Sequence, residues 1–199
     1  MNEGRLDQVC KAVLADSCAV QNLLSSTTLQ TACMTAGFQF AITKYCLYEC
    51  LDKPRKIDRP GDVELRRRLR AARTDGLFPD HELTVEDLQE AAVLRLRRRL
   101  GAGELSAIAL AKRFRIGFQT DDDRAEKLAV DVLTRENVQT TPHVLGWLLF
   151  HGHVADHHVD TIVQEHTAAG RNIATRFRST HGEAARIRTM AQAPPSQDR

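Results

Sequence analysis

The sequence lacks any long apolar segment. No apolar run reaches the roughly 18 residues that a membrane-spanning helix needs, and no signal peptide precedes the first predicted strand. We therefore expect a soluble, cytoplasmic protein with no membrane partner. The net charge is also small, +2 at pH 7, so the overall charge does not indicate a nucleic-acid binder.

Paired cysteines and aromatic clusters are absent as well. The five cysteines all fall within the first 50 residues, and none forms a CxxC pair. A disulfide framework or a zinc knuckle would need closer, paired spacing, so we expect free, buried thiols in a reducing compartment. The single tryptophan, Trp147, lies in an apolar segment, which favours core packing over base stacking.

What is present is the pattern of one α/β domain. Hydrophobic residues make up 42% of the 199 residues and charged residues 27%, which is ordinary for a globular protein. Strand-like and helix-like patterns alternate, which predicts a three-layer α/β/α sandwich around a mostly parallel sheet. The expected strands cover 9–14, 38–43, 115–120 and 138–141, with a weak one ending near 83, and the expected helices cover 19–33, 45–51, 64–73, 84–100, 104–111, 125–133 and 144–150.

We expect the domain to span residues 1–165. Residues 166–199 read as a basic C-terminal helix or tail, whose last dozen residues are predicted to be disordered. The segment 52–62, with two prolines and a glycine among charges, is predicted to be a loop.

Acidic residues follow the predicted strands. Asp16 follows the first strand, Asp121 and Asp122 follow the strand at 115–120, Glu104 opens the helix before that strand, and Glu49 lies after the second. Ligands bind at the carboxyl ends of parallel strands, so these side chains are expected to converge. Carboxylates forced together repel unless a cation compensates, and clusters of oxygen ligands suit Mg²⁺ or Mn²⁺. Such a cluster indicates phosphodiester hydrolysis.

Each acidic residue also has a simpler interpretation. An isolated surface Asp or Glu is usually a solubilising group, and the aspartates at 121–123 could only cap the following helix. Five histidines have spacings that are compatible with a transition-metal site, but they fall around a predicted turn. Surface histidines that bind no metal are the simpler explanation there. These histidines are His143, His151, His153, His157 and His158.

A glycine-rich segment offers a second alternative. Gly101, Gly103 and Ala107 have the spacing of a dinucleotide-binding turn. That turn needs a strand before it, to deliver a helix N-terminus to the pyrophosphate. Here an arginine-rich helical segment, 95–100, precedes it, so the required context is missing.

Three segments together resemble the PIN-domain family of nucleases. The segment 101–111, Gly-Ala-Gly-Glu-Leu-Ser-Ala-Ile-Ala-Leu-Ala, is similar to the family's Gly-x-Gly-Glu-x-x-Ala-Ile-x-Leu-Ala signature. The segment 120–125, Thr-Asp-Asp-Asp-Arg-Ala, is similar to its Thr-Asp-Asp-x-x-Ala stretch, and 138–154 follows its closing strand, helix and turn. Upstream, 13–17 resembles the first-strand aspartate motif.

The resemblance implies divalent-metal-dependent cleavage of RNA. It makes Asp16, Glu104 and Asp122 the metal-binding and catalytic acids, with Asp121 beside them and Glu49 as a further acid. It also implies that the hydroxyl groups of Ser17 and Thr120 support the metal-binding acids. Many compact members are toxins of toxin–antitoxin pairs and form dimers, so a protein antitoxin and a homodimer are implied partners. The alternatives are a non-catalytic PIN-like module that binds RNA or protein, and a metal-dependent DNA nuclease.

Arginines cluster in three places. They gather at 66–73, at Arg95, Arg97, Arg98 and Arg99, and between 171 and 188. Such runs are usually solvated helix faces, but the group at 95–99 could instead follow a phosphate backbone.

If Arg97, Arg98 and Arg99 contact nucleic acid, replacing all three by alanine will weaken binding and flatten its dependence on salt, because each phosphate contact releases counterions. The measurement is oligonucleotide affinity over a series of salt concentrations. Unchanged affinity would make these residues solubilising groups.

Overall fold

A computed structural model describes residues 6, 8–54 and 60–192. Its sheet contains five parallel strands in the order β3-β2-β1-β4-β5. Val13 of β1 pairs with Phe40 of β2 on one side and with Gly117 of β4 on the other, so β1 is the central strand. The strands are β1 Ala12–Ala15, β2 Gln39–Thr43, β3 Asp80–His81, β4 Gly117–Gln119 and β5 Val138–Gln139.

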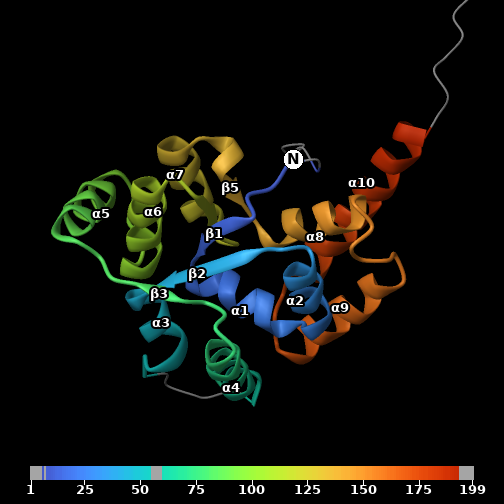
Figure 1. The fold of residues 1–199 in the computed structure, drawn as a ribbon, viewed down its shortest axis with the longest axis horizontal. Coiled ribbons are helices and arrows are strands. Elements are labelled where there is room, and N and C mark those ends of the chain that lie inside the picture. Colours follow the sequence, from blue (N-terminus) through green and yellow to red (C-terminus); the bar gives the residue numbers. More distant parts are fainter. Residues whose placement is uncertain (1–5, 7, 55–59, 193–199) are drawn as a thin grey trace, which may run out of the picture.

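Helices connect the strands and lie on either side of the sheet. In Figure 1, α5, α6 and α7 lie on one side of the strands, and α1, α2, α4 and α9 lie on the other. The chain runs outward from β1 through β2 to β3 and then returns past β1 to β4 and β5. With the usual right-handed crossovers, this change of direction places the connecting helices of the two halves on opposite faces of the sheet. The predicted α/β class with a parallel sheet is therefore confirmed. The helices are α1 Ser17–Ser25, α2 Thr27–Thr35, α3 Lys44–Leu51, α4 Pro60–Thr74, α5 Val85–Arg97, α6 Ala102–Phe114, α7 Asp123–Leu133, the 3₁₀ turn η1 Arg135–Asn137, α8 Thr141–Phe150, α9 His158–Ala168 and α10 Ala174–Gln192.

Local signals explain most helix starts. The Thr84 side chain caps α5 and the Asp87 carboxylate accepts from the Thr84 N–H, so the predicted capping pair is confirmed. Proline begins α4 inside the segment predicted as a loop, and residues 55–59 of that loop lie outside the described part.

The prediction of one helix over residues 19–33 is wrong. The chain breaks at Ser26, whose extended backbone ends α1 and whose hydroxyl accepts a 3.0 Å hydrogen bond from the Leu29 N–H to start α2. The same hydroxyl donates to the Glu165 carboxylate. The break between α1 and α2 is therefore stabilised by Glu165, which lies 139 residues away in the sequence.

The expectation of buried thiols is confirmed for three of the five cysteines, and the expectation that Trp147 packs in the core is confirmed. None of the five cysteines forms a disulfide; Cys33, Cys46 and Cys50 are buried, whereas Cys10 and Cys18 are only half-buried. Trp147 is buried and meets Phe38 edge to face. In the described part of the chain, no helix is both long enough and apolar enough to cross a membrane.

The C-terminal helix α10 packs on α8 and contributes to the same hydrophobic core as the sheet. Its side chain Phe177 is fully buried. At Gly146 of α8, an added Cβ would lie 2.6 Å from the side chains of both Leu6 and Thr180, so the absence of a side chain lets both ends of the chain approach α8. The division between residues 165 and 166 stays a prediction, and residues 193–199 lie outside the described part.

Replacing Phe177 with alanine should reduce the free energy of unfolding by about 3–5 kcal/mol, because a fully buried ring is lost from the core. The control is Met190→Ala on the same helix, whose side chain is 64% exposed and whose loss should change stability by less than about 0.5 kcal/mol. Urea unfolding measures both. Equal effects would show that α10 is not part of the core in solution.

Candidate metal site at the carboxyl edge of the sheet

The candidate site lies where the strand order reverses, between the carboxyl ends of β1 and β4. Asp16 directly follows β1 and is 1% exposed. Its Oδ1 accepts a 2.8 Å hydrogen bond from the Ala19 N–H and so caps α1. Its Oδ2 accepts from the Thr120 hydroxyl, which follows β4. Adjacent parallel strands thus bring residues 104 positions apart into contact.

The environment of Asp16 disfavours its charge. Burial above all, together with the charges of the nearby Asp121 and Glu104 carboxylates, raises the pKa of Asp16 to about 7. The hydrogen bonds from Ala19 and Thr120 oppose this pKa shift without cancelling it. The Asp16 carboxylate therefore needs either a proton or a cation at neutral pH.

Glu49 of α3 and Glu104 of α6 approach each other beside a pair of glycines. An oxygen of each carboxylate lies within 4 Å of the position that a Cβ on Gly101 would occupy. A Cβ on Gly103 would lie 2.5 Å from Glu49 Oε2, so only glycine leaves room for this carboxylate. The Ser17 hydroxyl donates to the same oxygen and links Glu49 to the start of α1.

The Glu104 carboxylate also closes the first turn of α6. Its Oε2 accepts a 2.5 Å hydrogen bond from the Gly101 N–H. Burial raises the pKa of Glu104, and the charges of Asp122 and Glu49 raise it further, while Arg124 lowers it. Glu104 therefore lies near both Asp122, which follows β4, and Glu49 of α3.

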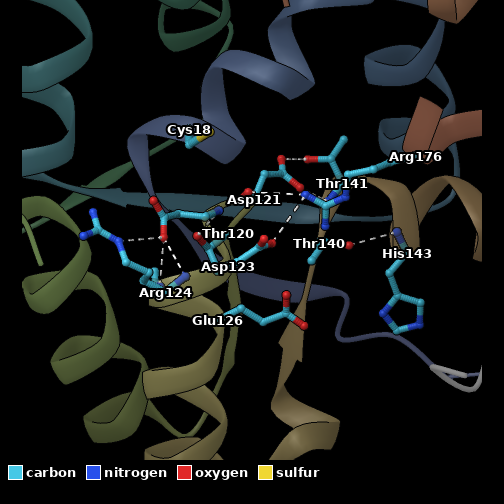
Figure 2. Close-up of polar contacts among 12 residues, drawn as sticks. Cys18, Thr120, Asp121, Asp123, Arg124, Glu126, Thr140, Thr141, His143 and Arg176 are labelled. Atoms are coloured by element: carbon cyan, nitrogen blue, oxygen red, sulfur yellow. Dashed lines mark hydrogen bonds and ion pairs between the residues drawn. The ribbon is translucent and has the colours of Figure 1, made fainter. Parts of the chain in front are cut away.

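Asp121, which Figure 2 labels, and Asp122 both follow β4 but have different surroundings. Asp122 Oδ1 caps α7 by accepting from the N–H groups of Arg124 at 2.7 Å and Ala125 at 3.1 Å. The prediction that an aspartate within 121–123 caps the following helix is therefore confirmed for Asp122. Asp121 instead accepts hydrogen bonds from the backbone N–H and hydroxyl of Thr141, at 2.8 and 2.6 Å.

Asn22 and Arg171 support Asp121, and the sequence analysis did not identify either. Asn22 Nδ2 donates to Asp121 at 2.7 Å, and Arg171 Nε donates to Asn22 Oδ1 at 2.8 Å. The buried His166 places Nε2 2.8 Å from the Asn22 carbonyl oxygen. These contacts join residues 99 to 149 positions apart, so no local motif could have indicated them.

The structure thus brings all the predicted acids and hydroxyls to one edge of the sheet. The carboxylates come from four separate segments. The pKa values of Asp16 and Glu104 are both raised in part by the charges of other acids in the group. Over residues 6, 8–54 and 60–192, no three His, Cys, Asp or Glu side chains already lie close enough together to hold one metal ion. The residues of the group are Asp16, Ser17, Glu49, Glu104, Thr120, Asp121 and Asp122.

Of the arginines predicted to contact nucleic acid, Arg95 and Arg97 lie in the last turn of α5, and Arg98 and Arg99 follow it. Arg95, Arg97 and Arg99 are exposed, whereas Arg98 is half-buried and lines a hollow with Asp123. Of the histidines, His143 lies in the first turn of α8, where its N–H donates to the Thr140 hydroxyl. The ring centroids of His151 and His153 lie 4.4 and 5.2 Å from that of Trp147, while the rings of His157 and His158 contact each other. No protein-family model, curated protein or solved structure matches the chain.

The raised pKa of Asp16 makes the stability of the metal-free protein depend on pH. The folded state binds a proton more tightly than the unfolded state, so this contribution is complete below about pH 4 and is lost as pH rises through 7. Compared with Asp16→Asn, the wild type should lose up to about 1.4 kcal/mol of unfolding free energy per pH unit across this window. Urea unfolding in chelator measures this difference.

The comparison with Asp16→Asn is needed because the pKa of His166 is lowered by burial, which acts in the opposite direction. The control is Asp123→Asn, since Asp123 is 80% exposed and should not alter the pH profile. Identical pH profiles for wild type and Asp16→Asn would contradict the raised pKa.

Proposed function

We propose that the protein is a divalent-metal-dependent endoribonuclease of the PIN type. The observation that carries this proposal is the gathering of five carboxylates at the strand-reversal edge of a parallel sheet, with Asp16 buried among them. Structural carboxylates are ordinarily paired with cations, whereas here the charges of other acids raise the pKa of both Asp16 and Glu104. The resemblance of segments 101–111 and 120–125 to PIN motifs supports the same assignment.

The donor chemistry fits Mg²⁺ or Mn²⁺. Asp16, Glu104 and Asp122 would hold the ion, with Glu49 as a further ligand, because hard cations prefer carboxylate oxygens. A cation would offset the repulsion among these acids and draw them closer. Once bound, such an ion activates water and stabilises charge on the leaving oxygen of a phosphodiester.

The other residues of the site hold the acids in place. Thr120 and the Ala19 N–H direct both oxygens of Asp16, and Ser17 directs Glu49. Asp121 accepts three hydrogen bonds, two from Thr141 and one from Asn22, which suits a residue that positions the start of α8 beside the metal. Rigid placement of this kind lowers the entropic cost of catalysis.

The proposal extends to the setting that the resemblance implies. RNA is the proposed substrate, and a toxin of a toxin–antitoxin pair, bound by a small antitoxin protein and dimeric, is the proposed biological form. A reducing cytoplasm is consistent with five cysteines that form no disulfide. Co-purification from the native host with a small protein encoded next to it would support this form.

Purified protein should cleave unstructured RNA in Mn²⁺ or Mg²⁺ and not in chelator. Asp122→Asn should lower the rate about a hundredfold or more, because it removes a charge that holds the cation while asparagine still caps α7. The matched control is Asp123→Asn, the adjacent and 80% exposed aspartate, which should retain activity within about threefold.

Three results would exclude parts of this proposal. Cleavage that neither chelator nor Asp122→Asn affects would exclude metal catalysis at these acids. RNA binding without cleavage in either metal would favour a non-catalytic PIN-like module, and equal cleavage of single-stranded DNA would remove the preference for RNA.

A further inference from the structure

A hollow of about 400 Å³ opens beside the acidic site, between α7, the start of α8 and α10. Thr140, which caps α8, lines it and is adjacent to Thr141, the residue that holds Asp121. On the opposite wall, the first turns of α10 contribute Thr175, Arg176, Ser179 and Thr180. The hollow thus carries four hydroxyl side chains and Arg176, together with His143, Glu183 and the paired Glu126 and Arg135. It borders Thr141 and Asp121, which support the proposed metal site (Figure 2).

Arg176 points from α10 towards the loop after β4 (Figure 2). Its Nη1 lies 3.4 Å from the Asp121 carbonyl oxygen and 4.0 Å from the carboxylate of the highly exposed Asp123. Both contacts use the same nitrogen and are long, and the side chain is 41% exposed. A guanidinium has five N–H donors in a planar fork, so the two contacts through Nη1 do not engage the donors on Nε and Nη2. This fork matches a phosphate group.

A second hollow, of about 440 Å³, lies beside the first turns of α7. The two hollows share Glu126 and Arg135, whose ion pair at 2.5 Å forms their common wall. The second is lined by Arg98 and Lys127 and also by Asp123 and Asp131, and the first by Arg176 and also by Glu183. Each hollow therefore offers a cation to a passing strand, among acidic side chains, on either side of α7, the helix that Asp122 caps.

We propose that the hollow beside α10 binds the single-stranded RNA next to the cleaved bond, and that Arg176 binds one of its backbone phosphates. This proposal rests on the proposed function, which supplies the substrate class. Hydroxyl side chains and arginine are typical phosphate and sugar ligands, and such contacts position a strand without reading its sequence. Arg176 thus acts in substrate positioning rather than in the chemical step.

The packing of α10 gives this interaction a matched control. Phe177 is buried in the core and fixes the rotation of the helix, so its neighbours on either side face different surroundings. Arg178 pairs with Asp160 of α9 at 3.3 Å and does not line the hollow. Arg176 and Arg178 therefore carry the same charge on the same helix turn, but only Arg176 faces the proposed RNA path.

The test is binding of a fluorescent single-stranded RNA oligonucleotide, measured by anisotropy in chelator so that no cleavage occurs. Arg176→Ala should weaken binding about tenfold at low salt and reduce the slope of log affinity against log salt by about 0.7, the value for one phosphate on a single strand. Arg178→Ala should bind like the wild type. Arg176→Lys should keep the salt slope but lose part of the affinity, because it keeps the charge without the fork.

The outcomes separate this inference from the proposed nuclease activity. Binding by Arg176→Ala equal to wild type, or an equal loss for Arg178→Ala, would overturn the role of the hollow even if the protein cleaves RNA. Selective loss for Arg176→Ala and a reduced salt slope would support the hollow even if the wild type cleaves nothing. Thermal unfolding of Arg176→Ala checks its fold. If alanine is not tolerated, Arg176→Lys still tests the contact, because affinity equal to wild type would then overturn the role of the guanidinium fork.

Discussion

A carboxylate buried among other carboxylates is the constraint around which this fold is arranged. Asp16 loses nearly all contact with water, and the acids near it make its charge less favourable still. The chain compensates only in part, with one backbone N–H of α1 and the hydroxyl of Thr120. The Thr120 hydroxyl is available only because β1 and β4 end side by side, so the parallel sheet and the acidic site are formed by the same contacts.

Much of this arrangement follows from short stretches of sequence. The apolar run before Asp16, the capping pair at Thr84 and Asp87 and the glycines before Glu104 each determine local structure with neighbouring residues, so strand and helix positions could be predicted to within a few residues. The order of acidic residues along the chain was also sufficient to predict their convergence, because parallel strands have their carboxyl ends at one edge.

What the sequence could not indicate depends on partners far along the chain. The break at Ser26 requires Glu165, and the orientation of Asp121 requires Asn22 and, behind it, Arg171. Local propensity carries no information about such pairs. The basic C-terminal segment was similarly uninformative, because its charges conceal a buried face that includes Phe177. A run of arginines shows that a helix is solvated but not which of its members face a neighbouring site.

The close packing at Gly146 links the two ends of the chain. Leu6, near the beginning, and Thr180, near the end, both occupy the space that a side chain at this position would fill, and both line the hollow beside α10. One wall of the proposed RNA path is therefore assembled from segments that lie far apart in the sequence. During synthesis this wall cannot form until α10 has left the ribosome, so the acidic edge of the sheet can fold before the surface that would hold a substrate against it.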